Sequence, residues 1–280
     1  AGGRPVMAEI DESLNMDPRS LRLRITPRTK VILPVHMLGA ACNMTEIMAL
    51  AHKQRIPVIE DNAQSNQGTY HGWKLGTLGD FGCFSFSYSK IMTTGEGGMV
   101  LARDPLNLAA ARAYSDHGHD SNPSAPSRGQ DTHRHGGFNY RMSAVHAAIG
   151  LVQLSKVEQT IKQHRQNFAA LKRAISGLRF RPVADESGDL GDALCFMLPS
   201  EAQAQTVARK LFEVEGIALK NLPDALNWHS AENWSHLLGA QAATLSKSGA
   251  ILRRTIALQI MASWTPQDIT GVAAAVKGAL

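Results

Sequence analysis

One lysine, Lys90, stands where the sequence can supply a reactive amine. It follows the apolar segment 82–86 and enters a turn of threonine and glycine that ends at Gly97-Gly98, before apolar residues 99–102. This pattern predicts two buried strands joined by the turn that carries the lysine. A buried ammonium is costly unless it is paired or neutral, and a neutral amine can form a Schiff base with an aldehyde. Lys90 is therefore a candidate nucleophile, with a structural salt bridge as the alternative.

A carboxylate, Asp61, ends the apolar segment 57–61. Residues 31–38 form a continuous apolar run that predicts a strand buried on both faces, and residues 44–55 have the spacing of an amphipathic helix, with Asn43 as its N-cap. Strand, helix and strand in this order predict a parallel βαβ unit, whose ligands bind beyond the carboxyl ends of the strands. Asp61 would lie at that edge, although a lone aspartate there is also typical of a helix cap or a solvated turn.

The elements that must position these residues follow from periodicity. Asp104-Pro105 predicts the start of a helix whose buried face includes Leu106, and residues 143–175 read as a long helix with a bend. Beyond Gly177 the pattern predicts a small α+β unit. We divide the chain into a partial large domain at 1–155, an inter-domain helix at 156–176 and a small domain at 177–280.

The loop 117–137 contains four histidines, and its role is open. A loop of this length in a compact domain is functional or disordered. The spacing of the histidines fits no standard zinc pattern, so we assign no metal site. The four histidines are His117, His119, His133 and His135.

Composition sets further bounds on this 280-residue chain, in which 44% of residues are hydrophobic and 19% charged. A net charge of +5, without a basic run, argues against nucleic acid, and the absence of a long apolar run argues against a membrane span. Three widely spaced cysteines favour reduced thiols in a cytoplasmic protein. Because the chain starts at Ala1 without an initiator methionine, we expect a missing N-terminal piece.

Five ordered motifs carry a resemblance: PVIEDNAQ at 57–64, GDFGCFSF at 79–86, Lys90, GEGG at 95–98 and NYRM at 139–142. The series resembles the pyridoxal-phosphate-dependent sugar aminotransferases of the DegT/StrS group, strongly up to about residue 175 and less so beyond. The resemblance implies the type I aminotransferase fold, which is an α/β architecture with a mostly parallel central sheet, flanking helices and a small C-terminal α+β domain. That group also has a phosphate-binding segment of Gly-Thr/Ser-Ala type upstream of where this chain begins.

The same resemblance implies roles for individual residues. Lys90 would bond to the cofactor's aldehyde and then move protons, and Asp61 would pair with the pyridinium nitrogen. Gln64 would lie near the ring, and Ser85 would bind the cofactor phosphate. Asn139 would reach the phosphate of the neighbouring subunit's cofactor, which implies a homodimer. Arg141 would support the loop of Asn139, or be a solvated or ion-paired arginine.

The implied reaction transfers an amino group from L-glutamate to a keto or aldehyde sugar, for polysaccharide or lipopolysaccharide synthesis. Similar sugar dehydratases have histidine in place of Lys90. The segment 220–229, followed by Trp234, is similar to members that aminate 3-deoxy-octulosonate, although its tryptophans can equally be core or interface aromatics; nucleotide-linked keto-hexoses are the commoner acceptors. A silent cofactor-binding homologue is the alternative. A nicotinamide dehydrogenase is disfavoured, because residues 95–98 lead into a strand rather than a helix.

Overall fold

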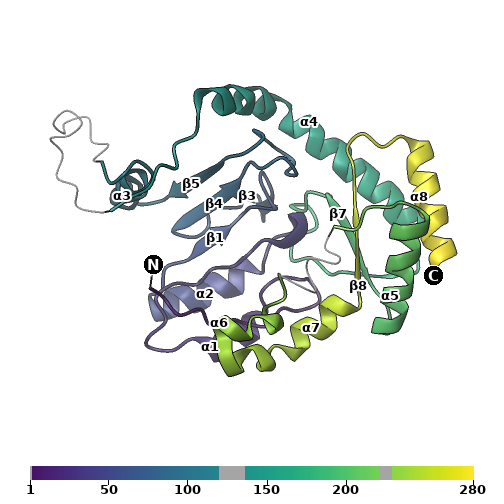
Figure 1. Ribbon diagram of the computed structural model, residues 1–280, viewed down its shortest axis with the longest axis horizontal. Coiled ribbons are helices and arrows are strands. Elements are labelled where there is room, and N and C mark those ends of the chain that lie inside the picture. Colours follow the sequence, from purple (N-terminus) through teal and green to yellow (C-terminus); the bar gives the residue numbers. More distant parts are fainter. Residues whose placement is uncertain (1, 120–135, 221–228) are drawn as a thin grey trace.

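The computed structural model describes residues 2–119, 136–220 and 229–280 (Figure 1). Its first sheet has the order β1-β4-β5, formed by β1 (Ile59–Asp61), β4 (Phe81–Ser85) and β5 (Gly98–Ala102). Strands β1 and β4 are parallel, whereas β4 and β5 form an antiparallel pair. Helices α1 (Pro18–Arg24) and α2 (Met44–Gln54) precede β1 along the chain. Asn43 caps α2 by accepting a hydrogen bond from the Glu46 N–H, as expected.

The parallel βαβ unit is confirmed, but the strand expected at 31–38 is wrong in extent. Only Ile32 and Val35 make parallel bridges, to Val58 and Asp61. Val31 and Leu33 are 41% and 47% exposed, so one face of this segment is not covered in the described chain. The segment then turns into the short 3-10 helix Met37–Gly39, which ends the extended conformation.

Two other burial expectations are also wrong. Strand β5 is expected to be buried, yet its residues Met99 and Val100 are 50% and 43% exposed, and none of the hydrophobic clusters of the described residues includes them. Helix α3 (Pro105–Ser115) begins after its Asp104 cap as expected, but Leu106 is 80% exposed and Ala113 is its buried residue. Periodicity finds these elements correctly, whereas exposure depends on what lies against them.

The C-terminal half begins with α4 (Ala144–Ala174), a single 31-residue helix that contains no break. The expected bend within it stays a prediction. A second sheet has the order β6-β7-β8, formed by β6 (Arg179–Phe180), β7 (Ala193–Met197) and β8 (Thr255–Gln259). Figure 1 shows α5 (Glu201–Arg209) and α8 (Pro266–Ala279) beside it. The other elements are the hairpin β2 (Thr69–Tyr70) and β3 (Trp73–Lys74), a π-helical turn (Lys210–Val214), the 3-10 helices Ala231–Asn233 and Gly239–Thr244, and the helices α6 (Ser235–Leu238) and α7 (Ser246–Arg253).

Separate hydrophobic clusters lie on the two sides of the molecule. One packs Phe196 and Ile256 against α4, α5 and α8, and another surrounds Ile47 of α2. A third joins Leu38 to Cys195, so the N-terminal segments also pack on the second sheet. The division at 155 and 176 stays a prediction. None of the helices in the described ranges is long and apolar enough to cross a bilayer.

The buried carboxylate of Glu60 ties β1 to its surroundings. It accepts hydrogen bonds from the backbone N–H groups of Gly76 (2.8 Å), Leu78 (2.8 Å) and Gly79 (2.6 Å), and it lies 3.1 Å from His36 Nε2. Burial by itself would raise the pKa of Glu60, but these hydrogen bonds outweigh it and hold the pKa below its usual range. The ionised carboxylate therefore stabilises the fold.

We predict that Glu60→Gln lowers the free energy of unfolding at pH 7 by roughly 3 kcal/mol, because the amide NH₂ faces buried donors and the charge is lost. Since the folded-state pKa is depressed, this contribution is present above the unfolded pKa of about 4.3 and is lost as the pH falls through the folded value. Urea denaturation at a series of pH values from 7 to 3 measures the difference in unfolding free energy between wild type and Glu60→Gln. This difference should become smaller as the pH falls.

The control is Glu186→Gln, because that carboxylate is 83% exposed and its 3.9 Å contact with Lys172 is weak. It should change stability by less than about 0.5 kcal/mol. An equal effect of both substitutions, or a Glu60→Gln effect that does not depend on pH, would contradict the prediction.

Candidate active site

Asp61 lies at the carboxyl end of β1, one residue beyond Glu60. Its backbone is paired with residues 34–36, because Asp61 N–H donates to the Pro34 carbonyl (2.9 Å) and its own carbonyl accepts from the His36 N–H (3.0 Å). One side-chain oxygen accepts from the Ala63 N–H at 2.9 Å. Successive residues of a strand point to opposite faces. Glu60 therefore holds the loop 76–79 while Asp61 is only half-buried.

Gln64 is held by the turn that follows residues 31–36. Its side-chain oxygen accepts a hydrogen bond from the Leu38 N–H at 3.0 Å. Leu38 is fully buried and has a positive φ of 53°, an uncommon conformation for leucine. The Leu38 carbonyl accepts from Arg181 Nη2 at 2.8 Å, so a residue of the second half of the chain fixes this turn.

Lys90 follows β4 and is half-buried, in the turn that the sequence predicts. Its backbone N–H donates to the Ser87 carbonyl at 3.1 Å. Burial lowers the pKa of Lys90, and the like charge of Lys220 lowers it further, against the opposing effects of Asp61 and Asp192. Lys90 and Asp61, which the sequence picks out 29 residues apart, thus influence each other electrostatically.

Ser85 ends β4 opposite Gly98 of β5. Its hydroxyl oxygen accepts from the Ser87 N–H at 3.3 Å and belongs to the same strand end that leads to Lys90. Asp61, Ser85 and Lys90 therefore all lie at the carboxyl ends of the neighbouring parallel strands β1 and β4 or just beyond them. The role of Ser85 toward a phosphate stays a prediction.

Asn139 belongs to a different part of the surface. It is exposed, and its side-chain oxygen accepts from Arg141 Nε at 3.1 Å, while Arg141 also makes a 3.2 Å ion pair with Asp116. Within the described ranges no hydrogen bond joins Asn139 to Asp61 or Lys90. Arg141 thus contacts the residue whose loop it was expected to support.

Sequence reasoning missed three residues near Lys90. Lys220 Nζ makes a 2.8 Å ion pair with Asp192 Oδ2, and both residues, together with His164, influence one another electrostatically. Lys220 opens a segment that the sequence marks for its resemblance to sugar-acid enzymes, which was a signal. Asp192 and His164 have no local signal, because neither lies in a recognisable motif.

The other expectations about this region are only partly accessible. Residues 221–228, including Trp228, and residues 120–135, including His133 and His135, lie outside the described ranges. Trp234 packs in a small cluster with Met7 around Leu238, as a core aromatic does.

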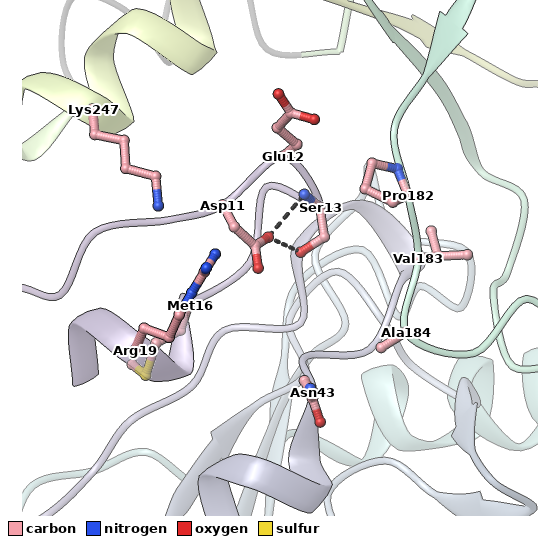
Figure 2. A pocket seen from close by; sticks show the side chains of 10 residues that line it. All are labelled: Asp11, Glu12, Ser13, Met16, Arg19, Asn43, Pro182, Val183, Ala184 and Lys247. Atoms are coloured by element: carbon pink, nitrogen blue, oxygen red, sulfur yellow. Dashed lines mark hydrogen bonds between the residues drawn. The ribbon is translucent and has the colours of Figure 1, made fainter. Parts of the chain in front are cut away.

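A separate pocket of about 460 Å³ lies between the N-terminal segment and residues 182–184 (Figure 2). Figure 2 shows Asp11 turned back toward Ser13, whose N–H it accepts at 2.8 Å. None of the five expected site residues lines it. The lining residues are Asp11, Glu12, Ser13, Met16, Arg19, Asn43, Pro182, Val183, Ala184 and Lys247.

Comparison with known proteins identifies the family. The model of the DegT/DnrJ/EryC1/StrS aminotransferase family matches residues 1–277. The chain belongs to this family. It is 32% identical over 245 residues to the GDP-perosamine synthase of Caulobacter vibrioides, which covers 84% of the chain. It is 33% identical over 189 residues, 66% of the chain, to the L-glutamine:2-deoxy-scyllo-inosose aminotransferase of Micromonospora echinospora.

The fold is likewise that of solved aminotransferases. An aminotransferase structure from Psychrobacter cryohalolentis superposes with a TM-score of 0.83 at 25% identity, over 99% of this family member and 75% of that chain. The expected α/β type I fold is confirmed. The chain spans 63% of the length of the Caulobacter protein and 45% of that of the Micromonospora protein.

We predict that Lys90 reacts with an amine-acylating reagent with a pH midpoint below the ~10.4 of an ordinary lysine, because burial and Lys220 disfavour its charged form. Asp61→Asn should move the midpoint lower still, since it removes a carboxylate that stabilises the ammonium. Mass spectrometry of the labelled peptides across pH 6–11 measures the midpoint in the wild type and in Asp61→Asn. A wild-type midpoint at or above ~10.4, or an upward shift in Asp61→Asn, would contradict this interpretation.

Proposed function

We propose that this protein is a pyridoxal-phosphate-dependent aminotransferase that transfers an amino group from L-glutamate to a keto or aldehyde sugar. The observation that carries the proposal is the position of Lys90, an amine with a lowered pKa, near the Asp61 carboxylate at the ends of β1 and β4. Such an edge of a parallel sheet is where ligands of α/β proteins bind.

The donor set fits the cofactor. Pyridoxal phosphate supplies an aldehyde that takes up the amino group and a protonated ring that withdraws electrons. The Lys90 amine, whose pKa is lowered by burial, suits the aldehyde, and the Asp61 carboxylate suits the pyridinium nitrogen. The Ser85 hydroxyl can donate to the phosphate, and Gln64, whose oxygen is engaged by Leu38, has its NH₂ group to offer the ring.

Lys90 has a second task in this proposal, which is to move protons. With its pKa lowered, Nζ is neutral in a larger fraction of molecules at neutral pH and can accept the proton from the α-carbon of the amino donor. It can then return a proton to the carbon that receives the amino group. Asp61 would hold the ring nitrogen by a charge-assisted hydrogen bond in this role.

The acceptor is either a nucleotide-linked keto-hexose or an oxidised 3-deoxy-octulosonate, for cell-surface polysaccharide or lipopolysaccharide synthesis in the cytoplasm. The similarity to a GDP-perosamine synthase supports the nucleotide-linked class. The name of the Micromonospora relative specifies L-glutamine as donor, so glutamine is the donor to test beside glutamate. Parallel assays of both donors against both acceptor classes identify the pair that turns over.

We predict that Lys90→Ala abolishes transamination, because the substitution removes the amine that would bond to the cofactor and move the protons. Borohydride reduction of the protein with pyridoxal phosphate should attach the cofactor to the peptide containing Lys90 and to no peptide of the variant. Asp61→Asn should lower kcat by about 10²-fold, since an electrostatic stabiliser is lost.

The matched control is Lys162→Ala, an exposed lysine of α4, which should keep both labelling and turnover. Labelling that persists in Lys90→Ala would contradict the catalytic assignment. Cofactor bound by the wild type, without turnover of any donor, would favour a silent cofactor-binding homologue instead.

The proposal includes a homodimer in which Asn139 contributes to the site of the neighbouring subunit. Its support is that Asn139 is exposed and makes its described side-chain contact with Arg141, away from Lys90 of the same chain. A polar side chain held in this way on an exposed segment is available to a second copy.

We predict complementation between Lys90→Ala and Asn139→Ala, each inactive or nearly so as a homodimer. A mixed dimer contains one intact site, because the intact Lys90 and Asn139 then come from different chains. Random pairing of equal amounts should restore about one quarter of wild-type activity. Aminotransferase assays of the two variants, mixed before and after they are unfolded and refolded together, measure the gain in activity. No gain, although mixed dimers form, would show that Asn139 does not act across the interface.

A further inference from the structure

The pocket of Figure 2 lies between segments that are far apart in the sequence. One wall is the turn of residues 11–16, and the other is the segment 182–184, which follows β6. Arg19 of α1, Asn43 at the start of α2 and Lys247 of α7 complete the lining. Its volume of about 460 Å³ falls within the roughly 300–1,000 Å³ of small-molecule sites.

One part of this pocket has a surplus of positive charge. The buried carboxylate of Asp17 accepts a hydrogen bond from Lys247 Nζ at 2.6 Å and lies 3.4 Å from Arg19 Nε. Burial by itself would raise the pKa of Asp17, but the hydrogen bonds from Lys247 and from the Arg19 N–H outweigh it and keep the pKa below its usual range. One ionised carboxylate therefore meets two cations. The Arg19 side chain is 83% exposed, so its guanidinium has N–H groups to offer an anion.

Asp11 brings a negative charge to the same pocket. Its Oδ1 accepts hydrogen bonds from the Ser13 N–H (2.8 Å) and the Ser13 hydroxyl, neither of which carries a charge. Among the described residues no lysine or arginine forms an ion pair with Asp11, whereas Glu12 beside it is paired with Arg179 at 2.6 Å. The charge of Glu12 is thus balanced, and that of Asp11 is open to a cationic group of a ligand.

The wall at 182–184 has a different character. Figure 2 shows Pro182 and Val183 across the pocket from Arg19 and Lys247. Both side chains are hydrocarbon, so this wall can bury an apolar group of a ligand. The pocket therefore presents one unbalanced positive charge, one unbalanced negative charge and an apolar surface.

We propose that this pocket binds a free amino acid with an apolar side chain, at a site separate from Lys90. The ligand carboxylate pairs with Arg19 beside Lys247, its ammonium pairs with Asp11, and its side chain packs on residues 182–184. A ligand that has only one of the two charges leaves the other lining charge unmatched, which is the physical basis of the preference for a zwitterion.

Both walls of the pocket are attached to the turn 37–39, which gives occupancy of the site a consequence. Asn15, in the first wall, accepts a hydrogen bond from the first N–H of this turn at 2.9 Å. Arg181, next to the second wall, donates to the Leu38 carbonyl at 2.8 Å, and the Leu38 N–H donates to Gln64. A ligand that contacts both walls restrains the turn, and through it the Gln64 side chain of the candidate active site.

The first test is calorimetric titration of the whole chain with three probes that share an isobutyl group. L-Leucine has both charges, 4-methylpentanoate lacks the ammonium, and 3-methylbutylamine lacks the carboxylate. Leucine should bind at least about 10-fold more tightly than either analogue, because each analogue loses one charge-assisted interaction. Equal affinity for leucine and one of the analogues would overturn the proposal, as would the absence of detectable leucine binding.

Two substitutions assign the two charges. Asp11→Asn keeps the oxygen that Ser13 binds and removes the charge, so it should weaken leucine binding about 10-fold and leave 4-methylpentanoate within about twofold. Arg19→Gln leaves Asp17 its pair with Lys247, and it should weaken leucine binding similarly and leave 3-methylbutylamine within about twofold.

The comparison of probes within each variant separates ligand binding from a structural role. A substitution that merely disturbs the fold weakens all three probes together, and that result would overturn the proposal. The control is Glu186→Gln, because that carboxylate is 83% exposed and does not line the pocket. It should leave the affinities of all three probes unchanged; an equal loss there would also overturn the proposal.

Hydrogen–deuterium exchange locates the ligand without any turnover. Leucine should slow exchange of the peptides that contain residues 11–16, 37–39 and 182–184, and leave the peptide 82–90 unchanged. Protection of residues 82–90 instead would place leucine at the candidate active site and overturn the proposal. The same protection is expected in Lys90→Ala, so a failure of the aminotransferase proposal leaves this result intact.

Discussion

The hydrogen bonds that converge on Glu60 determine where the candidate site can form. Three backbone N–H groups of residues 76–79 and the His36 ring enclose this carboxylate, so β1 and the loop before β4 cannot move independently. Gly82 shows how tight the contact is, because a Cβ there would lie 2.3 Å from the Gly76 carbonyl oxygen. Since neighbouring strand residues face opposite ways, fixing Glu60 inward leaves Asp61 on the other face at the strand end, where its charge raises the pKa of Lys90.

Electrostatics then divides the charged groups into two kinds. Glu60 has several donors, which compensate its burial and keep it ionised as a structural anion. Within the described residues no such set of hydrogen bonds reaches the Lys90 ammonium, and its burial instead favours the neutral form. The same cost of burying a charge thus has opposite outcomes at the two residues. A half-buried lysine near a carboxylate therefore says more about the candidate site than the buried ion pairs elsewhere in the described chain do.

Local chemistry in the sequence was enough to find some features and not others. Asn43 and Asp104 cap their helices as predicted, because capping depends on residues within one turn. The prediction that Leu106 and Leu33 are buried was wrong, since burial depends on the surfaces that pack against a residue, which periodicity does not specify. Lys90 and Asp61 stand out by residue type at strand ends. The Lys220–Asp192 pair joins residues 28 positions apart on different segments, which no local pattern encodes.

The turn Met37–Gly39 connects these separate parts of the site. Leu38 adopts a left-handed conformation there, which costs of order 1 kcal/mol for a residue with a side chain. Its N–H binds Gln64 on one side, its carbonyl binds Arg181 on another, and Gly39 packs on Asp192. Residues that follow β1 and β6, and the residue that precedes β7, are thus fixed against one strained turn. This turn therefore ties the segment after Asp61 to the segment that holds Lys220 through Asp192.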